Sequence, residues 1–196
     1  MGELEQLLLE ACGEGNVMKV KKFLLEPNIN LNEKDKYYQK FTPFALACCR
    51  GHIEIVKLFL EDQRTDINLE NHVGSTAFWH ACANRKLEIV KLMILNDRVD
   101  INKPDVYEAT PLIVATYNRD IEIIKWILAS YRHNSLENKA SKGSALDIAK
   151  KKDLVEIVEL FESFQSNPQQ TRIELRKNIG LACKYLFEVH EFTKTN

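Results

Sequence analysis

The stretch Thr110-Pro111-Leu112-Ile113-Val114-Ala115 decides the fold, because it is one of four copies of a motif that recurs at a fixed interval. The copies begin at Thr42, Thr76, Thr110 and Ser144, each 34 residues after the one before. The other three read Thr42-Pro43-Phe44-Ala45-Leu46-Ala47, Thr76-Ala77-Phe78-Trp79-His80-Ala81 and Ser144-Ala145-Leu146-Asp147-Ile148-Ala149. A constant period of this size is typical of a solenoid, in which each repeat buries its apolar face against its neighbours.

A second motif follows each copy and predicts a second helix. It starts eleven residues after the Thr or Ser, at Ile53, Leu87, Ile121 and Val155. Its apolar residues have the spacing of a helix that is buried over more than half of its circumference. A short polar break such as Arg50-Gly51-His52 separates the two motifs, and the polar stretch before each Thr has the composition of a turn. Each repeat is therefore predicted to be helix, tight turn, helix.

The Thr at the head of each first helix has a physical role, because its hydroxyl can accept hydrogen bonds from unpaired N–H groups of the first turn. Pro43 and Pro111 follow at the first helical position, where a missing N–H costs nothing. In these features the chain resembles the ankyrin-repeat family, with its Thr-Pro-Leu-His-x-Ala signature, over residues 4–164. The resemblance implies an all-α ankyrin-repeat solenoid with hairpin fingers in residues 1–164, followed by a C-terminal helical extension in residues 165–196.

Three departures from the family pattern are informative. The His of the signature is replaced by Ala45, Trp79, Ile113 and Asp147, so the hydrogen bonds by which it joins neighbouring turns in the family lose their usual donor. The first and fifth repeats are degenerate, as expected of repeats that cap the two ends. The connector into the second repeat is two residues longer than its counterparts, and the extra length falls in residues 37–41.

Composition indicates a soluble cytoplasmic or nuclear protein and gives no sign of a nucleic-acid or membrane partner. The 196 residues include 27 basic and 28 acidic ones, for a formal net charge of −1. No apolar run is long enough to cross a bilayer, and the N-terminus is acidic, unlike a secretion signal. The cysteines are interpreted as core thiols, because Cys12, Cys48 and Cys82 share one small-residue position of the repeat and no Cys/His pairs have metal-ligand spacing.

No motif predicts catalysis, a cofactor or a metal. The sequence contains no Gly-rich phosphate loop and no nucleophile elbow, and His80 is interpreted as a packed or partly exposed side chain instead of a general base. Glutamates three residues before Lys57, Lys91 and Lys125 indicate solvated ion pairs on a helix face. We therefore expect a non-catalytic protein. The alternatives are a targeting or regulatory subunit or domain of an enzyme, and a microbial effector that acts on host proteins.

The resemblance implies a protein partner that binds the hairpin tips and the inner face of the first helices. Aromatic and Arg side chains are typical anchors of such interfaces. The alternative is that some of them simply pack between hairpins. We expect a monomer whose partner-binding residues are Tyr37, Tyr38, Gln39, Phe41, Arg50, His72, Trp79, Asn84, Tyr107, Tyr117 and Asn118.

The resemblance also implies a modification. Asn68 and Asn102 close Asp-Ile-Asn elements that match the family's substrate for an asparaginyl hydroxylase. The favoured interpretation is structural, because Asn suits a tight turn.

The period ends near Gln165, where Asn167 is predicted to cap a new helix that has Pro168 at its first position. A capping box at Thr171–Glu174 is an alternative start. Apolar residues continue to Phe192, with a break at Gly180. We expect this helix to cap the open end of the solenoid. The alternatives are a partner-binding helix and the start of a further domain.

Overall fold

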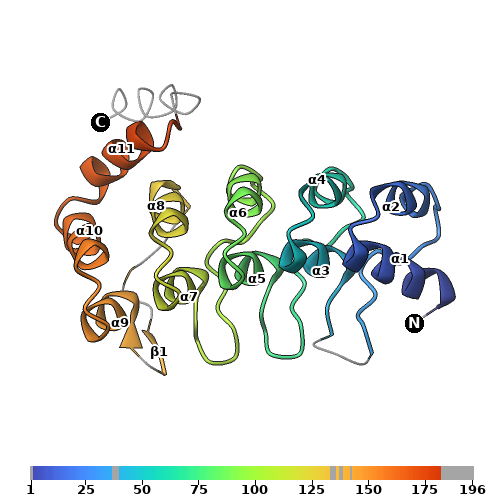
Figure 1. Cartoon of the computed structure of the whole chain (residues 1–196), viewed down its shortest axis with the longest axis horizontal. Coiled ribbons are helices and arrows are strands. Elements are labelled where there is room, and N and C mark those ends of the chain that lie inside the picture. Colours follow the sequence, from blue (N-terminus) through green and yellow to red (C-terminus); the bar gives the residue numbers. More distant parts are fainter. Residues whose placement is uncertain (1, 37–39, 133–135, 137–138, 142, 182–196) are drawn as a thin grey trace, which may run out of the picture.

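The computed structural model describes residues 2–36, 40–132, 136, 139–141 and 143–181, and these residues form the predicted all-α solenoid. The first helices of the five repeats stand in one row, and the hairpin loops project from it on the side away from the second helices (Figure 1). The first helices are α1 (Glu3–Glu14), α3 (Pro43–Arg50), α5 (Ala77–Ala83), α7 (Pro111–Tyr117) and α9 (Ala145–Lys151). The second helices are α2 (Val17–Leu24), α4 (Ile53–Glu61), α6 (Leu87–Ile94), α8 (Ile121–Ala129) and α10 (Val155–Ser166).

The repeated Thr or Ser starts each inner first helix as the sequence predicts. The hydroxyl of Thr42 accepts a hydrogen bond from the Ala45 N–H at 3.1 Å, and Thr76, Thr110 and Ser144 do the same three residues ahead. In turn, the Asp147 carboxylate accepts a hydrogen bond from the Ser144 N–H, which completes a capping box. Just before this helix, β1 (Lys139–Ala140) and β2 (Gly143–Ser144) pair antiparallel and form the last hairpin.

Small side chains let the first helices approach one another closely. Ala47, Ala81, Ala115 and Ala149 are all fully buried. Cys12, Cys48 and Cys82 are equally buried and free, so their interpretation as core thiols is confirmed. Cys49 is free but only half-buried, so it is not a core thiol, and Cys183 lies outside the described residues. Burial raises the pKa of the Cys12 thiol far above its usual range, so the thiol stays protonated and unreactive.

Asparagines join successive hairpins by hydrogen bonds. The Asn68 side chain donates to the Arg98 carbonyl and accepts from the Asp100 N–H, both at 2.7 Å. Asn32 makes the same two contacts with Arg64 and Asp66 one repeat earlier, and Asn102 donates to the Arg132 carbonyl. These contacts agree with the structural interpretation of Asn68 and Asn102.

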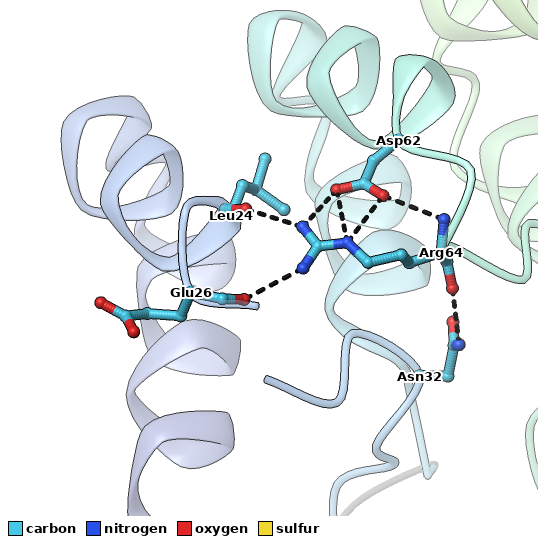
Figure 2. A network of polar contacts seen from close by, with 5 residues as sticks. All are labelled: Leu24, Glu26, Asn32, Asp62 and Arg64. Atoms are coloured by element: carbon cyan, nitrogen blue, oxygen red, sulfur yellow. Dashed lines mark hydrogen bonds and ion pairs between the residues drawn. The ribbon is translucent and has the colours of Figure 1, made fainter. Parts of the chain in front are cut away.

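Arginines at the same period hold the ends of the second helices. The Arg64 guanidinium donates to the carbonyls of Leu24 and Glu26 and pairs with Asp62 (Figure 2). Arg98 donates to the carbonyls of Leu60 and Thr65, and Arg132 to those of Ile94, Asn96 and Val99. Each arginine thereby binds carbonyls in the last turn of the second helix one repeat earlier and in the loop that follows that helix. This series was not predicted from the sequence, although its members are 34 residues apart.

The C-terminal helix α11 (Pro168–Asn178) packs against both α8 and α10. The predicted start is confirmed, because the Asn167 side chain accepts from the Gln170 N–H at 3.1 Å. The alternative capping box is wrong: Thr171 lies inside the helix and donates to the Ser163 carbonyl. The break at Gly180 is confirmed by a left-handed φ of 71°, two residues beyond the end of the helix.

Arginines of α11 bind the end of α8. Arg172 donates to the Leu128 carbonyl and Arg176 to the Ala129 carbonyl, both at 3.2 Å. Leu128 occupies the same place in its repeat as Glu26, Leu60 and Ile94, the carbonyls that the repeated arginines bind. The helix α11 therefore takes over the contact that the fifth repeat does not make. The predicted capping of the open end stays a prediction, and residues 182–192 of that segment lie outside the described residues.

Candidate protein-binding groove

A groove of about 510 Å³ opens between the hairpins and the first helices of the last three repeats. It centres on α7, with α5 on one side and α9 on the other. Its lining is mostly apolar and aromatic: Trp79, Ala83, Asp105, Tyr107, Ala109, Ile113, Val114, Tyr117, Asn118, Ala140, Ser141 and Ile148. A concave apolar surface with a few polar groups is the usual form of a binding site.

Four of the predicted partner-binding residues meet at this groove: Trp79, Tyr107, Tyr117 and Asn118. Tyr107 on the hairpin is 63% exposed, and Tyr117 at the end of α7 is 47% exposed. The hairpin that carries Tyr107 is shaped by the buried Asp105, whose carboxylate accepts from the N–H groups of Tyr107 and Ala109 at 2.9 Å. The backbone that carries Tyr107 is thus held in place, so that little backbone ordering entropy is lost on binding.

Trp79 has a structural role as well as a place in the groove. It is half-buried, and its indole N–H donates to the Ala109 carbonyl of the next hairpin at 2.8 Å. Trp79 stands where the repeat signature has His, and it supplies the bond between turns that was expected to lack a donor. This corrects the sequence-based expectation at that position. It also fixes the floor of the groove.

The two asparagines of the predicted set both bind helix ends. Asn118 donates to the Ala83 carbonyl and Asn84 to the His80 carbonyl, each at 2.8 Å. Asn118 thereby joins α7 to α5 beneath the groove. Asn84 is exposed and lies outside the groove lining.

The remaining predicted residues lie apart from this groove. Arg50 and His72 are exposed on earlier repeats and do not line it. Phe41 is a correction: it is half-buried, with its ring 4.6 Å from the His80 ring in an edge-on contact, instead of exposed at a hairpin tip. Tyr37, Tyr38 and Gln39 lie outside the described residues, so their role stays a prediction.

His80 is buried and neutral, as its interpretation as a packed side chain requires. Its Nε2 lies 3.1 Å from the Asn71 side-chain nitrogen. The Asn71 oxygen accepts from the N–H groups of Val73 and Ser75, so the amide nitrogen points to the imidazole and donates. Burial lowers the pKa of His80 to about 4.

The role of Asp105 in positioning the backbone of Tyr107 was not predicted from the sequence. The signal was available, because Asp105 follows Asn71 by the same 34 residues, and both side chains accept two backbone N–H groups of their hairpin. Val114 and Ile148 were not predicted either, because apolar residues of a first helix are equally typical of the core.

The described residues contain no group of three or more His, Cys, Asp or Glu side chains placed to hold a metal ion. Within the same part of the chain, none of the helices combines the length and apolarity needed to span a membrane. In comparisons with known protein families, a family model described as ankyrin repeats in three copies matches residues 7–105 and, in a second match, residues 46–140.

Proposed function

Because the chain belongs to the ankyrin-repeat family, whose members generally act in protein–protein interactions, we propose that it is a non-catalytic module that binds a protein through the groove at α7. The observation that carries this proposal is the meeting of Trp79, Tyr107 and Tyr117 around one groove. Tyr and Trp are enriched among the residues that dominate the free energy of binding at interfaces.

The groove is already formed in the free chain, which favours binding. Trp79 is held by the Ala109 carbonyl, and the backbone of Tyr107 is held by Asp105. A partner therefore meets a surface whose hairpin backbone is already ordered, which lowers the entropy cost of binding. A cluster of exposed aromatic side chains is also more typical of an interaction site than of a surface that faces only water.

We further propose that the chain acts as a monomer in a reducing compartment, with the cytoplasm as the first choice. Cys12, Cys48, Cys49 and Cys82 are free thiols, and free thiols persist where disulfides are kept reduced.

The test is a binding measurement on a partner captured from a lysate of the source organism. Tyr107→Ala and Tyr117→Ala should each weaken its affinity by more than about 2 kcal/mol, roughly 30-fold, if both rings are anchors. Isothermal calorimetry measures the change. Both side chains are largely exposed, so the melting temperature should stay close to that of the parent.

Leu95→Ala is the matched control, because Leu95 is 54% exposed at the end of α6, away from the groove. It should leave the affinity unchanged. The proposed site is wrong if both tyrosine variants fold and still bind every captured partner as tightly as the parent does.

A further inference from the structure

One rim of the groove is basic. Arg119 directly follows Asn118 at the end of α7, and Lys151 and Lys152 lie at the end of α9, one turn after Ile148. The Lys152 ammonium lies 3.7 Å from the centroid of the Tyr117 ring. No carboxylate of the described residues forms an ion pair with any of these three cations. The rim therefore presents positive charge beside an exposed aromatic ring.

By contrast, cations on the outer faces of the same repeats form ion pairs with glutamates. Lys91 pairs with Glu88 at 2.6 Å, and Lys125 with Glu122 at 3.1 Å. Even Lys150, the immediate neighbour of Lys151, pairs with Glu162 at 2.8 Å. Since the whole chain has a formal net charge of only −1, the positive charge at the rim is a local feature.

The basic rim continues along the edge of the first helices toward the second repeat. The stem of the Lys86 side chain lies over Gly51, the residue that follows Arg50, so close that a methyl group at Gly51 would be 3.2 Å from the Lys86 Cδ. Arg50 and Lys86 thus belong to neighbouring repeats but lie together. Cations therefore recur along this edge from the second repeat to the fifth, although one of them, Arg85, pairs with Asp120 at 3.1 Å.

We propose that the groove at α7 binds an acidic, extended peptide segment of the partner, an inference that rests on the proposed function above. Its carboxylates would meet Arg119, Lys151 and Lys152, where charge-assisted hydrogen bonds replace the present hydration. An apolar or aromatic side chain of the segment would cover the floor formed by Val114 and Ile148. Opposite charges on the two surfaces would also speed the association.

The geometry of the stack sets the spacing of the acidic residues. The helices α5, α7 and α9 lie side by side in one row (Figure 1). Packed helices are about 8–10 Å apart, and an extended chain advances about 3.3–3.6 Å per residue. A segment that runs along the row therefore reaches the next repeat after about three residues. Because side chains of a fully extended chain alternate in direction, the segment would take the polyproline II form, in which every third side chain faces the same way. Glu or Asp at every third position would then meet the cations of successive repeats.

A nucleic acid fits this surface less well. The hairpin side of the groove carries the exposed carboxylates of Glu108 and Asp147 and the buried Asp105. A phosphate backbone has a charge at every step and would approach these carboxylates, whereas a peptide can direct its charges to one rim. The single basic rim thus favours an acidic peptide.

The experiment selects a random 12-residue peptide display library on the full chain. The enriched peptides should be acidic, with an apolar or aromatic residue between the acids. Synthetic copies, labelled for fluorescence anisotropy, should bind the Lys151→Glu/Lys152→Glu double variant about tenfold more weakly, or worse, than the parent. Raising the salt from about 50 to about 300 mM should weaken binding to the parent as well.

The matched control is Lys21→Glu/Lys22→Glu on α2, which makes the same change in net charge at exposed positions far from the groove. It should leave the affinity unchanged, and the melting temperatures of both double variants show whether they fold. Enriched peptides that are neutral or basic would overturn the inference. So would equal losses in the two double variants, or a labelled 20-nucleotide single-stranded DNA bound as tightly as the peptides.

Variants of Tyr107 and Tyr117 separate the two proposals. If Tyr107→Ala and Tyr117→Ala weaken peptide binding but the lysine reversal does not, the groove is the site and only the acidic partner is wrong. If neither the tyrosine variants nor the lysine reversal weakens peptide binding, both the acidic-peptide inference and the proposed function are wrong. A selection that enriches no peptide counts against both.

Discussion

Trp79 shows how a side chain of different chemistry can make the contact that the His of the repeat signature makes in the family. An indole and an imidazole both present a ring N–H, and at this position that N–H reaches the carbonyl of the next hairpin. The larger ring also covers part of the groove floor. The absence of His at this position therefore does not remove the hydrogen bond between hairpins. Trp79 makes that bond and also lines the groove.

Replacing Trp79 by Phe should lower the free energy of unfolding by about 1 kcal/mol, because the Ala109 carbonyl loses the indole N–H and keeps only the Asp105 N–H as a donor. Urea unfolding measures the change. Tyr107→Phe is the control, since it alters a polar ring group at an exposed position of the same groove and should shift stability by less than about 0.5 kcal/mol. Equal stability of Trp79→Phe and the parent would show that the bond contributes nothing.

His80 makes stability depend on pH. Its pKa is about 4 in the folded chain and near 6.5 in an ordinary environment, so the unfolded chain binds more protons between these values. Stability should therefore be greatest above pH 6.5 and fall as the pH falls toward 4, with a loss that approaches ~3 kcal/mol from this group. The physical reason is that a charged imidazole would be buried facing the Asn71 amide donor.

Urea unfolding at several pH values between 7 and 4 measures this dependence. His80→Gln should flatten the curve over that window, because the replacement does not titrate. A variant with the same slope as the parent would place the titrating group elsewhere.

At the scale of one element, α11 is held by two arginines whose partners are carbonyls of α8. Arg172→Ala/Arg176→Ala should lower stability by about 1–3 kcal/mol, since buried carbonyls of Leu128 and Ala129 lose charged donors and Tyr131 loses its cation contacts. Thermal melting measures the loss. Lys177→Ala, at an exposed position of the same helix, is the control and should change little. If the double variant has the same melting temperature as the parent, docking of α11 does not stabilise the solenoid.

At the scale of the whole molecule, the features that recur from repeat to repeat could be predicted from the sequence. The Thr caps, the buried Ala positions and the shared Cys position each repeat in phase, and each follows from local backbone chemistry or close helix packing. The groove was predicted in part, since Tyr107 and Tyr117 are aromatic at positions that the helix pattern does not bury.

Contacts outside the period were not predictable in the same way. Phe41 belongs to the connector, and only the three-dimensional structure places its ring against His80 of the following repeat. The docking of α11 on α8, past the intervening repeat, likewise has no signature in the spacing of apolar residues. Both contacts join segments distant in sequence, where local propensity carries no information.

The arginine contacts of α11 also affect the order in which the repeats unfold. In a linear array the terminal repeats fray first, because each has only one neighbour. At the C-terminal end the chain passes α9 and α10 and then fastens itself to α8, so the fifth repeat lies inside a closed loop of contacts. Fraying there requires α11 to release the fourth repeat as well. Amide hydrogen exchange should accordingly begin at α1 and α2, and the solenoid would unravel from one end only.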